Sequence, residues 1–135
     1  MKLLLVLLFA AFAVVGFATV PQSDADYEAA MKKVMPAQGS LRGNVTAKNA
    51  DGTKADAAKL EEVFALSEKF WKARNTQDAV DWSVTAKNAA AAIGKLAAAG
   101  EWDKIPDEQK KLGGTCMACH TAHREKLPEG GYKIK

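Results

Sequence analysis

The sequence predicts an all-α protein built as an antiparallel bundle of four helices. From residue 23 onward the apolar residues recur every three or four positions, which is the spacing of one face of a helix. No segment shows the strict alternation of apolar and polar residues that is typical of a β-strand. Connections of short or moderate length join the helical segments, and helices joined in this way pack antiparallel. We therefore expect no β-strand in this chain.

The composition indicates one compact domain. Of the 135 residues, 48% are hydrophobic and 26% are charged, which is typical of a globular chain. The formal net charge is only +3, far from the concentrated basic face that nucleic-acid binding requires. Nucleic acid is therefore not an expected partner.

Residues 1–18 have the layout of a secretory signal peptide. A single lysine precedes an apolar run from Leu3 to Val15, and the small residues Gly16 and Ala18 suit the positions that a signal peptidase recognises. We expect cleavage after Ala18, which leaves a mature domain of residues 19–135. The alternative is a retained membrane anchor, because the stretch from Leu3 to Val20 is just long enough to span a bilayer. Both alternatives predict an exported protein, periplasmic or beyond, which meets a membrane only if the anchor is retained.

The first helix is expected to begin at Ser23. Ser23 and Asp26 form a pair of the capping-box kind, and Pro36 predicts a kink or break near Met35. Residues 42–53 are rich in Gly, Asn, Asp and Thr and predict a surface connection. One face of this helix is expected to carry Tyr27, Ala30, Met31, Val34, Met35, Gln38 and Leu41.

Two long amphipathic helices are expected next, over residues 54–74 and 78–99. Their apolar positions repeat every three or four residues, and the many alanines of the second favour helix and permit close neighbours. Gly100 provides a stop signal. The buried faces are expected to carry Leu60, Val63, Phe64, Ser67, Phe70 and Trp71 in the first, and Trp82, Ala86, Ala89, Ile93, Leu96 and Ala97 in the second.

The last helix is expected to begin near Pro106. Proline suits the first turn of a helix, and Asp107 and Glu108 place negative charge at the N-terminus. This helix carries both cysteines and both histidines of the chain, within the eight positions from Cys116 to His123. Such a concentration of reactive residue types predicts the functional site.

The sequence Cys116-Met117-Ala118-Cys119-His120 is C-x-x-C-H, the sequence through which c-type haem is attached. In such sites thioether bonds join both cysteines to the haem vinyl groups, and the adjacent imidazole binds iron. On a helix Cys116, Cys119 and His120 lie close together on one side, so one helix can hold the edge of the ring and supply the proximal iron ligand. We expect one covalently bound haem c.

Three other interpretations of the cysteine pair fit less well. A thioredoxin-like redox pair lies in a βαβ unit, which the helical pattern does not provide. Cys116, Cys119, His120 and His123 lie on one face of one helix and cannot surround a tetrahedral zinc ion. Cysteines three positions apart on a regular helix need local distortion to form a disulfide.

The chain resembles the class II cytochromes c, the cytochrome c prime family of four-helix-bundle haem proteins. The resemblance covers the mature chain and is carried by the helical layout, by LGGTCMACHTAHRE and by AAMKKVM. The family often has a glycine three residues before the first cysteine, as at Gly113, and a basic residue after the haem motif, as at Arg124. His123 stands where an aromatic residue is common, and we expect it at the haem edge or the surface. Tyr27 stands where many relatives have an arginine near the haem propionates, so propionate pairing would fall to Arg124 or to a lysine such as Lys32.

The second axial iron ligand decides between two functions, because a filled site favours electron transfer and an open site admits small gases. His123 lies one turn from His120 on the same helix and cannot reach the opposite face of the ring. Of the four methionines, only Met31 and Met35 lie outside the signal and the attachment motif. The resemblance places the first helix on the distal side of the haem, and its methionine-ligated branch favours Met31. Alternatively, both methionines are ordinary core residues.

These expectations predict an exported mono-haem cytochrome that transfers electrons and is not an enzyme, with His120 as proximal and Met31 as distal iron ligand. The alternative is a five-coordinate haem protein that binds nitric oxide or carbon monoxide. A third interpretation is a structural subunit in which the haem is incidental. The expected partners are redox proteins, and because relatives often form dimers through their first two helices, the resemblance also implies a homodimer.

Overall fold

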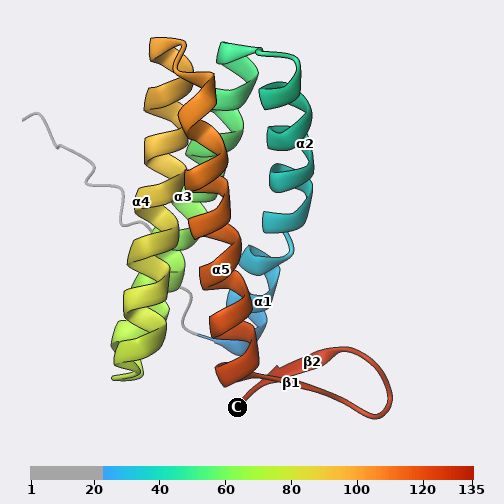
Figure 1. Ribbon diagram of the computed structural model, residues 1–135. Helices are drawn as coiled ribbons and strands as arrows, with labels where there is room; N and C mark the ends of the chain where they lie inside the picture. Colours follow the sequence, from blue (N-terminus) through green and yellow to red (C-terminus); the bar gives the residue numbers. More distant parts are fainter. Residues whose placement is uncertain (1–22) are drawn as a thin grey trace, which may run out of the picture.

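The computed structural model describes residues 23–135, which are mostly helical (Figure 1). The predicted signal peptide, residues 1–18, and its cleavage position lie outside the described residues. The elements are α1 Asp24–Met31, α2 Val34–Thr46, α3 Ala50–Ala73, α4 Gln77–Ala99, the 3-10 helix η1 Trp102–Lys104, α5 Ile105–His123, β1 Arg124–Lys126 and β2 Tyr132–Ile134. None of these helices is both long enough and apolar enough to cross a membrane.

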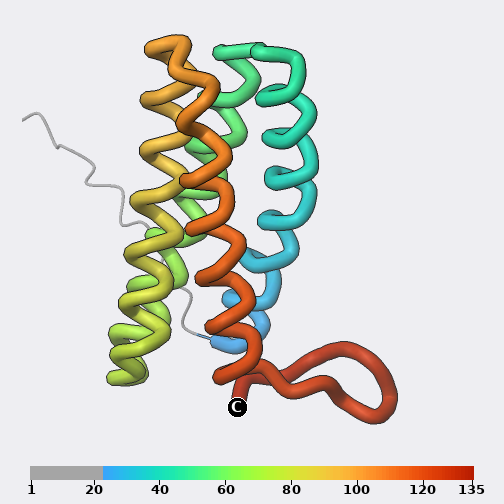
Figure 2. The backbone as a smooth tube through the Cα atoms, in the orientation of Figure 1, coloured from blue at the N-terminus to red at the C-terminus, as the bar shows by residue number. Residues whose placement is uncertain are grey.

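The helices form a bundle with four arms, which confirms the all-α architecture. The first arm is divided into α1 and α2, and α3, α4 and α5 form the other three (Figure 1). Successive arms run in opposite directions, so the chain path ascends and descends the long axis in turn (Figure 2). The closest packing joins α3 to α4, followed by α4 to α5 and α2 to α3. The first arm and α5 are packed less closely against each other.

The first arm begins as predicted but breaks at a different place. The hydroxyl of Ser23 accepts a hydrogen bond from the backbone N–H of Asp26 (3.1 Å), which confirms the N-cap. The break lies at Lys32 and Lys33, a few residues before the expected position. Pro36 sits in the first turn of α2, where its missing N–H has no helical partner to lose. Proline here marks the start of a helix and not a kink inside one.

The surface connection predicted over residues 42–53 is present but much shorter than expected. α2 continues to Thr46 and α3 begins at Ala50, so only a tight turn separates them. The side chain of Asn49 caps α3 by accepting a hydrogen bond from the N–H of Gly52 (3.1 Å). The polar residues that suggested a loop are therefore largely the ends and caps of two helices.

The core lies on the faces predicted for α3 and α4. All the positions predicted to be buried on α3 are buried, whereas Trp82 and Leu96 on α4 are half-buried. Met35 is 70% exposed, because the break between α1 and α2 interrupts the helical periodicity that placed it on the buried face. Burial of a large apolar side chain contributes roughly 1.5–3 kcal/mol. The largest fully buried side chains include Phe70, Leu41, Leu60, Ile93 and Ile105.

The boundaries of the last two long helices follow their predicted signals. Gly100 has a φ of 72°, in the left-handed region that favours glycine, and it ends α4. Pro106 lies in the first turn of α5, with Asp107 and Glu108 beside it. The predicted start of the motif-bearing helix is therefore confirmed.

A short hairpin after α5 corrects the expectation that the chain has no strand. β1 and β2 pair antiparallel, with Glu125 opposite Lys133. Gly130 and Gly131 both have positive φ (98° and 81°), which lets the connection turn back on itself. Ile134 packs against a buried aromatic cluster, so the base of the hairpin contacts the end of the bundle while its turn projects sideways, away from the helices (Figure 1).

Candidate functional site

The three residues of the motif lie in the part of α5 that borders the bundle interior. Cys116, Cys119 and His120 are all half-buried, while Met117 between them is 69% exposed. The two cysteines are free thiols. Cys116 packs against the larger core cluster and Cys119 against the aromatic one. The helical spacing thus directs both thiols and the imidazole inward and leaves the intervening methionine outside.

A cavity of about 490 Å³ lies beside this side of α5. Its volume is within the range of small-molecule and cofactor sites, and such sites are mostly apolar with a few polar groups. Every arm of the bundle and the hairpin contribute to its wall. The wall includes Met31, Val34, Phe64, Trp71, Trp82, Ala86, Cys116, Cys119 and His120.

The composition of this wall fits a c-type haem. One side offers two thiols and an imidazole at the required spacing, and α1 contributes the thioether of Met31 to the same cavity. Apolar and aromatic side chains line the space between them, as a porphyrin requires. Within residues 23–135 no group of three or more His, Cys, Asp or Glu side chains could hold a metal ion.

The structure separates the two candidate methionines. Met31 is half-buried at the end of α1 and packs against both hydrophobic clusters. Met35 borders the same cavity but is 70% exposed. A methionine that is held in the interior is the better candidate for a fixed ligand, so the geometry favours Met31.

Burial sets the protonation states of the motif residues. Desolvation raises the pKa of Cys116, and it raises the pKa of Cys119 to about 11, with Cys116 and Asp78 adding to the effect. Burial and then the charge of Arg124 lower the pKa of His120. Both thiols are therefore protonated at neutral pH, unlike the thiolate of a thioredoxin-like redox pair. The imidazole is neutral, which is the form that binds a metal ion.

A buried polar network borders the cavity, and sequence reasoning missed it. The indole N–H of Trp71 donates to the Tyr27 hydroxyl (3.0 Å), which lies 3.3 Å from Oγ of Ser67. Oγ of Ser67 is in turn 2.8 Å from Oγ of Ser83. The predicted buried faces already contained Tyr27, Ser67 and Trp71, and their polar atoms, which need partners when buried, were the available signal.

His123 lies at the edge of the cavity, where it pairs with Asp78. Nε2 of His123 is 2.9 Å from Oδ2 of Asp78, and the histidine side chain is 17% exposed. Its ring packs against Trp71 and Trp82, with ring centroids 5.0 and 6.0 Å away. The pairing joins the end of α5 to the start of α4, and no local sequence signal indicated it.

Three basic side chains border the cavity. Lys32 pairs with Glu28 (2.8 Å) and Lys133 with Glu125 (3.1 Å). The guanidinium of Arg124 lies 3.7 Å from the centroid of the Tyr132 ring. Both side chains considered for propionate pairing, Arg124 and Lys32, therefore lie at the cavity, and the hairpin adds a third cation that the sequence did not suggest.

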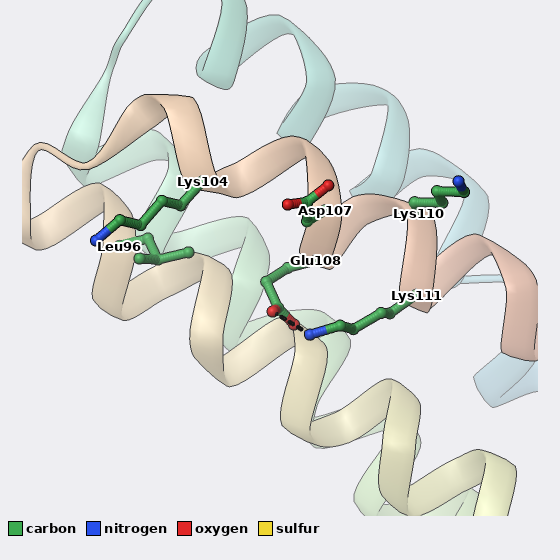
Figure 3. Close-up of a pocket in the computed structure, with 6 residues that line it drawn as sticks. All are labelled: Leu96, Lys104, Asp107, Glu108, Lys110 and Lys111. Atoms are coloured by element: carbon green, nitrogen blue, oxygen red, sulfur yellow. Dashed lines mark hydrogen bonds and ion pairs between the residues drawn. The ribbon is translucent and has the colours of Figure 1, made fainter.

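A second depression lies on the surface near the start of α5, away from the motif (Figure 3). Its volume is about 680 Å³, and five of its six lining residues are charged. Lys111 pairs with Glu108 (2.6 Å), a contact drawn in the figure. A depression with a single apolar residue, Leu96, does not have the character of a cofactor site.

Comparison of the chain with protein-family models, with curated proteins and with solved structures finds no match. Functional inference therefore depends on the residues of the site and on their arrangement.

Proposed function

We propose that this chain is an exported, mono-haem c-type cytochrome that transfers electrons. The single observation that carries the proposal is the cavity itself, because Cys116, Cys119 and His120 of α5 and Met31 of α1 border one largely apolar space. The four-arm bundle with the motif on its last helix agrees with the resemblance to the class II cytochromes c. Export follows from the signal peptide predicted over residues 1–18.

Each residue has a definite part in this proposal. Cys116 and Cys119 hold the haem through thioether bonds, His120 is the proximal iron ligand and Met31 the distal one. A bound haem supplies an iron that cycles between Fe(II) and Fe(III). The surrounding side chains keep water away and hold both ligands in place, so that little rearrangement accompanies a change of charge. Histidine and methionine together favour a raised reduction potential, which suits a carrier.

The proposal includes no bond-making reaction on a substrate. The partners are redox proteins that reach the haem edge, and the resemblance implies that two copies of the chain associate through their first two helices. The predicted export places these encounters in the periplasm or outside the cell.

The visible spectrum of haem-loaded protein tests the axial ligation. We expect the ferric protein to be low-spin and to show the sulfur-to-iron charge-transfer band of methionine ligation. Met31→Ala should abolish that band and give a high-spin spectrum with rapid carbon monoxide uptake, while Met35→Ala should leave the band in place. A wild-type protein that is high-spin and binds carbon monoxide rapidly would instead indicate the gas-binding function.

A further inference from the structure

The position of Met31 depends on α1, a helix of only eight residues. The break at Lys32 and Lys33 separates α1 from α2, so the longer helix does not fix the orientation of α1. Isolated helices of this length are not stable in water and depend on tertiary contacts. The contacts that dock α1 therefore decide where Met31 lies.

Tyr27 makes the most extensive of these contacts. It precedes Met31 by one helical turn, which places both side chains on the same side of α1. Its ring stacks on Phe70 of α3 with a centroid separation of 4.1 Å and meets the edge of Trp71 at 5.6 Å. Only 8% of Tyr27 is exposed. The helix is thus attached to α3 through an aromatic cluster one turn before the methionine.

The hydrogen bonds of Tyr27 have a fixed direction. An indole N–H can only donate, so the Tyr27 oxygen accepts from Trp71 and its own proton is free for Ser67. Oγ of Ser83 donates to the carbonyl of Ala79 (2.7 Å), and Ser67 can therefore donate to Ser83. Burial raises the pKa of Tyr27, so the phenol keeps its proton at neutral pH. These hydrogen bonds connect α1 to α3 and α4, and each N–H or O–H group in the series donates to an acceptor.

The other polar contact between α1 and α3 is weaker. Asp24 and Arg74 form an ion pair of 2.5 Å, in which the aspartate side chain is 65% exposed. Exposed ion pairs contribute little to stability, whereas a buried donor left without its acceptor is costly. The network around Tyr27 is therefore expected to dominate the docking of α1.

We propose that Tyr27 is the positioning residue for the distal ligand, and that its contacts with Trp71, Ser67 and Phe70 hold Met31 at the iron. This inference rests on the proposed ligation by Met31. Any movement of α1 that carries Met31 away from the cavity breaks the Tyr27 network. The network therefore sets how easily an external ligand replaces the methionine.

Competition between Met31 and added imidazole for the iron tests this inference. The measurement uses the mature protein with haem bound and the iron in the ferric state. Tyr27→Phe keeps the ring and removes only the hydroxyl, which leaves the buried indole N–H of Trp71 without its acceptor. We expect the affinity for added imidazole to rise about tenfold, since such an unsatisfied donor is worth roughly one decade in an equilibrium constant. Ser67→Ala retains the bond between Trp71 and Tyr27 and removes only the partner of the Tyr27 hydroxyl proton. That bond is long (3.3 Å) and therefore weaker, so the affinity should rise less, about two- to threefold.

Two controls separate positioning from general destabilisation. Ile105→Val weakens the core at the start of α5, away from α1, and should lower stability towards denaturant while changing imidazole affinity less than twofold. Arg74→Gln removes the exposed ion pair to Asp24 and should change imidazole affinity less than twofold, with little effect on stability. Unchanged imidazole affinity in Tyr27→Phe, or an equal rise in a control, would overturn the inference. If Tyr27→Phe yields no holoprotein, an unchanged Ser67→Ala would overturn it.

The wild-type protein distinguishes this inference from the function on which it rests. If the wild-type protein shows no methionine band, or binds imidazole as tightly as Met31→Ala does, then Met31 is not the iron ligand. The positioning role of Tyr27 is refuted by the same result. If the wild-type protein shows the band and Tyr27→Phe leaves the imidazole affinity unchanged, only the positioning role of Tyr27 is refuted.

Discussion

The two ends of the bundle contrast in how they are packed, although the same long arms reach both. At the closed end, where α2 meets α3 and α4 leads into α5, Leu41, Thr53, Ile93 and Ile105 are at most 2% exposed. At the cavity end, around α1, the end of α5 and the hairpin, Cys116, Cys119 and Met31 are only half-buried (Figure 1). A single helical pattern therefore serves a solid core at one end and a lined space at the other.

The contrast lies in the chemistry of the side chains. Alanines and aliphatic residues dominate the closed end, where helices approach closely and the buried polar side chains are Thr53 and Asp56. The cavity end contains the Tyr27–Trp71–Ser67–Ser83 network, the His123–Asp78 pair and the two thiols. The cavity end is therefore not unpacked, since Phe70, Trp71, Ala79 and Val80 are also buried there. What sets it apart from the closed end is the combination of a buried aromatic cluster with polar pairs and the motif residues.

The largest expected effect breaks the packing of the closed end. Ile93→Ala removes a fully buried side chain and should lower the free energy of unfolding by about 2–5 kcal/mol. Met117→Ala, at the cavity end, shortens a side chain that is 69% exposed and should change it by less than about 0.5 kcal/mol. Urea unfolding of both variants measures the difference. Equal destabilisation would contradict the burial of Ile93 in the closed end and the exposure of Met117.

The helix caps at the two ends give a smaller contrast. Asn49 caps α3 at the closed end, and Asn49→Ala should cost about 1 kcal/mol. Thr76 occupies the corresponding position before α4 at the cavity end but makes no side-chain capping bond, so Thr76→Ala should cost only a few tenths of that, about 0.3 kcal/mol. The free energy of unfolding of each variant measures these costs. A larger loss in Thr76→Ala than in Asn49→Ala would contradict the assignment of the caps.

The smallest expected effect concerns pH at the closed end. Burial opposes ionisation of Asp56, but hydrogen bonds from Ser40, Asn44 and Lys59 outweigh it and lower the pKa of the carboxyl. A depressed folded-state pKa gives stability that is complete above the unfolded value, about 3.9, and that is lost as the pH falls through the folded value. Asp56→Asn should therefore be less stable than wild type at neutral pH, and the gap should narrow below about pH 4. Urea unfolding across this pH range measures the difference in unfolding free energy between wild type and Asp56→Asn. A difference that does not change with pH would show that ionisation of Asp56 is not its cause.

The fold could be predicted where helical periodicity and local stop signals agree. The α3 stripe, Gly100 after α4 and Pro106 in α5 all lie where the pattern placed them. The connection after α2 was predicted too long because Gly43, Asn44 and Asn49 are poor helix formers, and only tertiary packing and capping make them helix ends. The hairpin was missed because its strands have three residues each, although Gly130-Gly131 was an available turn signal.

The candidate site could be predicted in its local part and not in its long-range part. C-x-x-C-H is a short, contiguous pattern, and the structure shows its three residues at one cavity. The resemblance already favoured Met31 over Met35, and the structure adds the break in the first arm, which leaves Met35 exposed. The partners of Tyr27 and His123 are forty or more positions away, so no local pattern could reveal them.

The most direct test of the central claim is the intact mass of the mature protein, expressed in a strain that attaches c-type haem. We predict the mass of residues 19–135 plus one haem for the wild type, and the mass of the polypeptide alone for a variant with Cys116→Ser and Cys119→Ser. A wild-type chain that carries no added haem mass under these conditions would contradict the account.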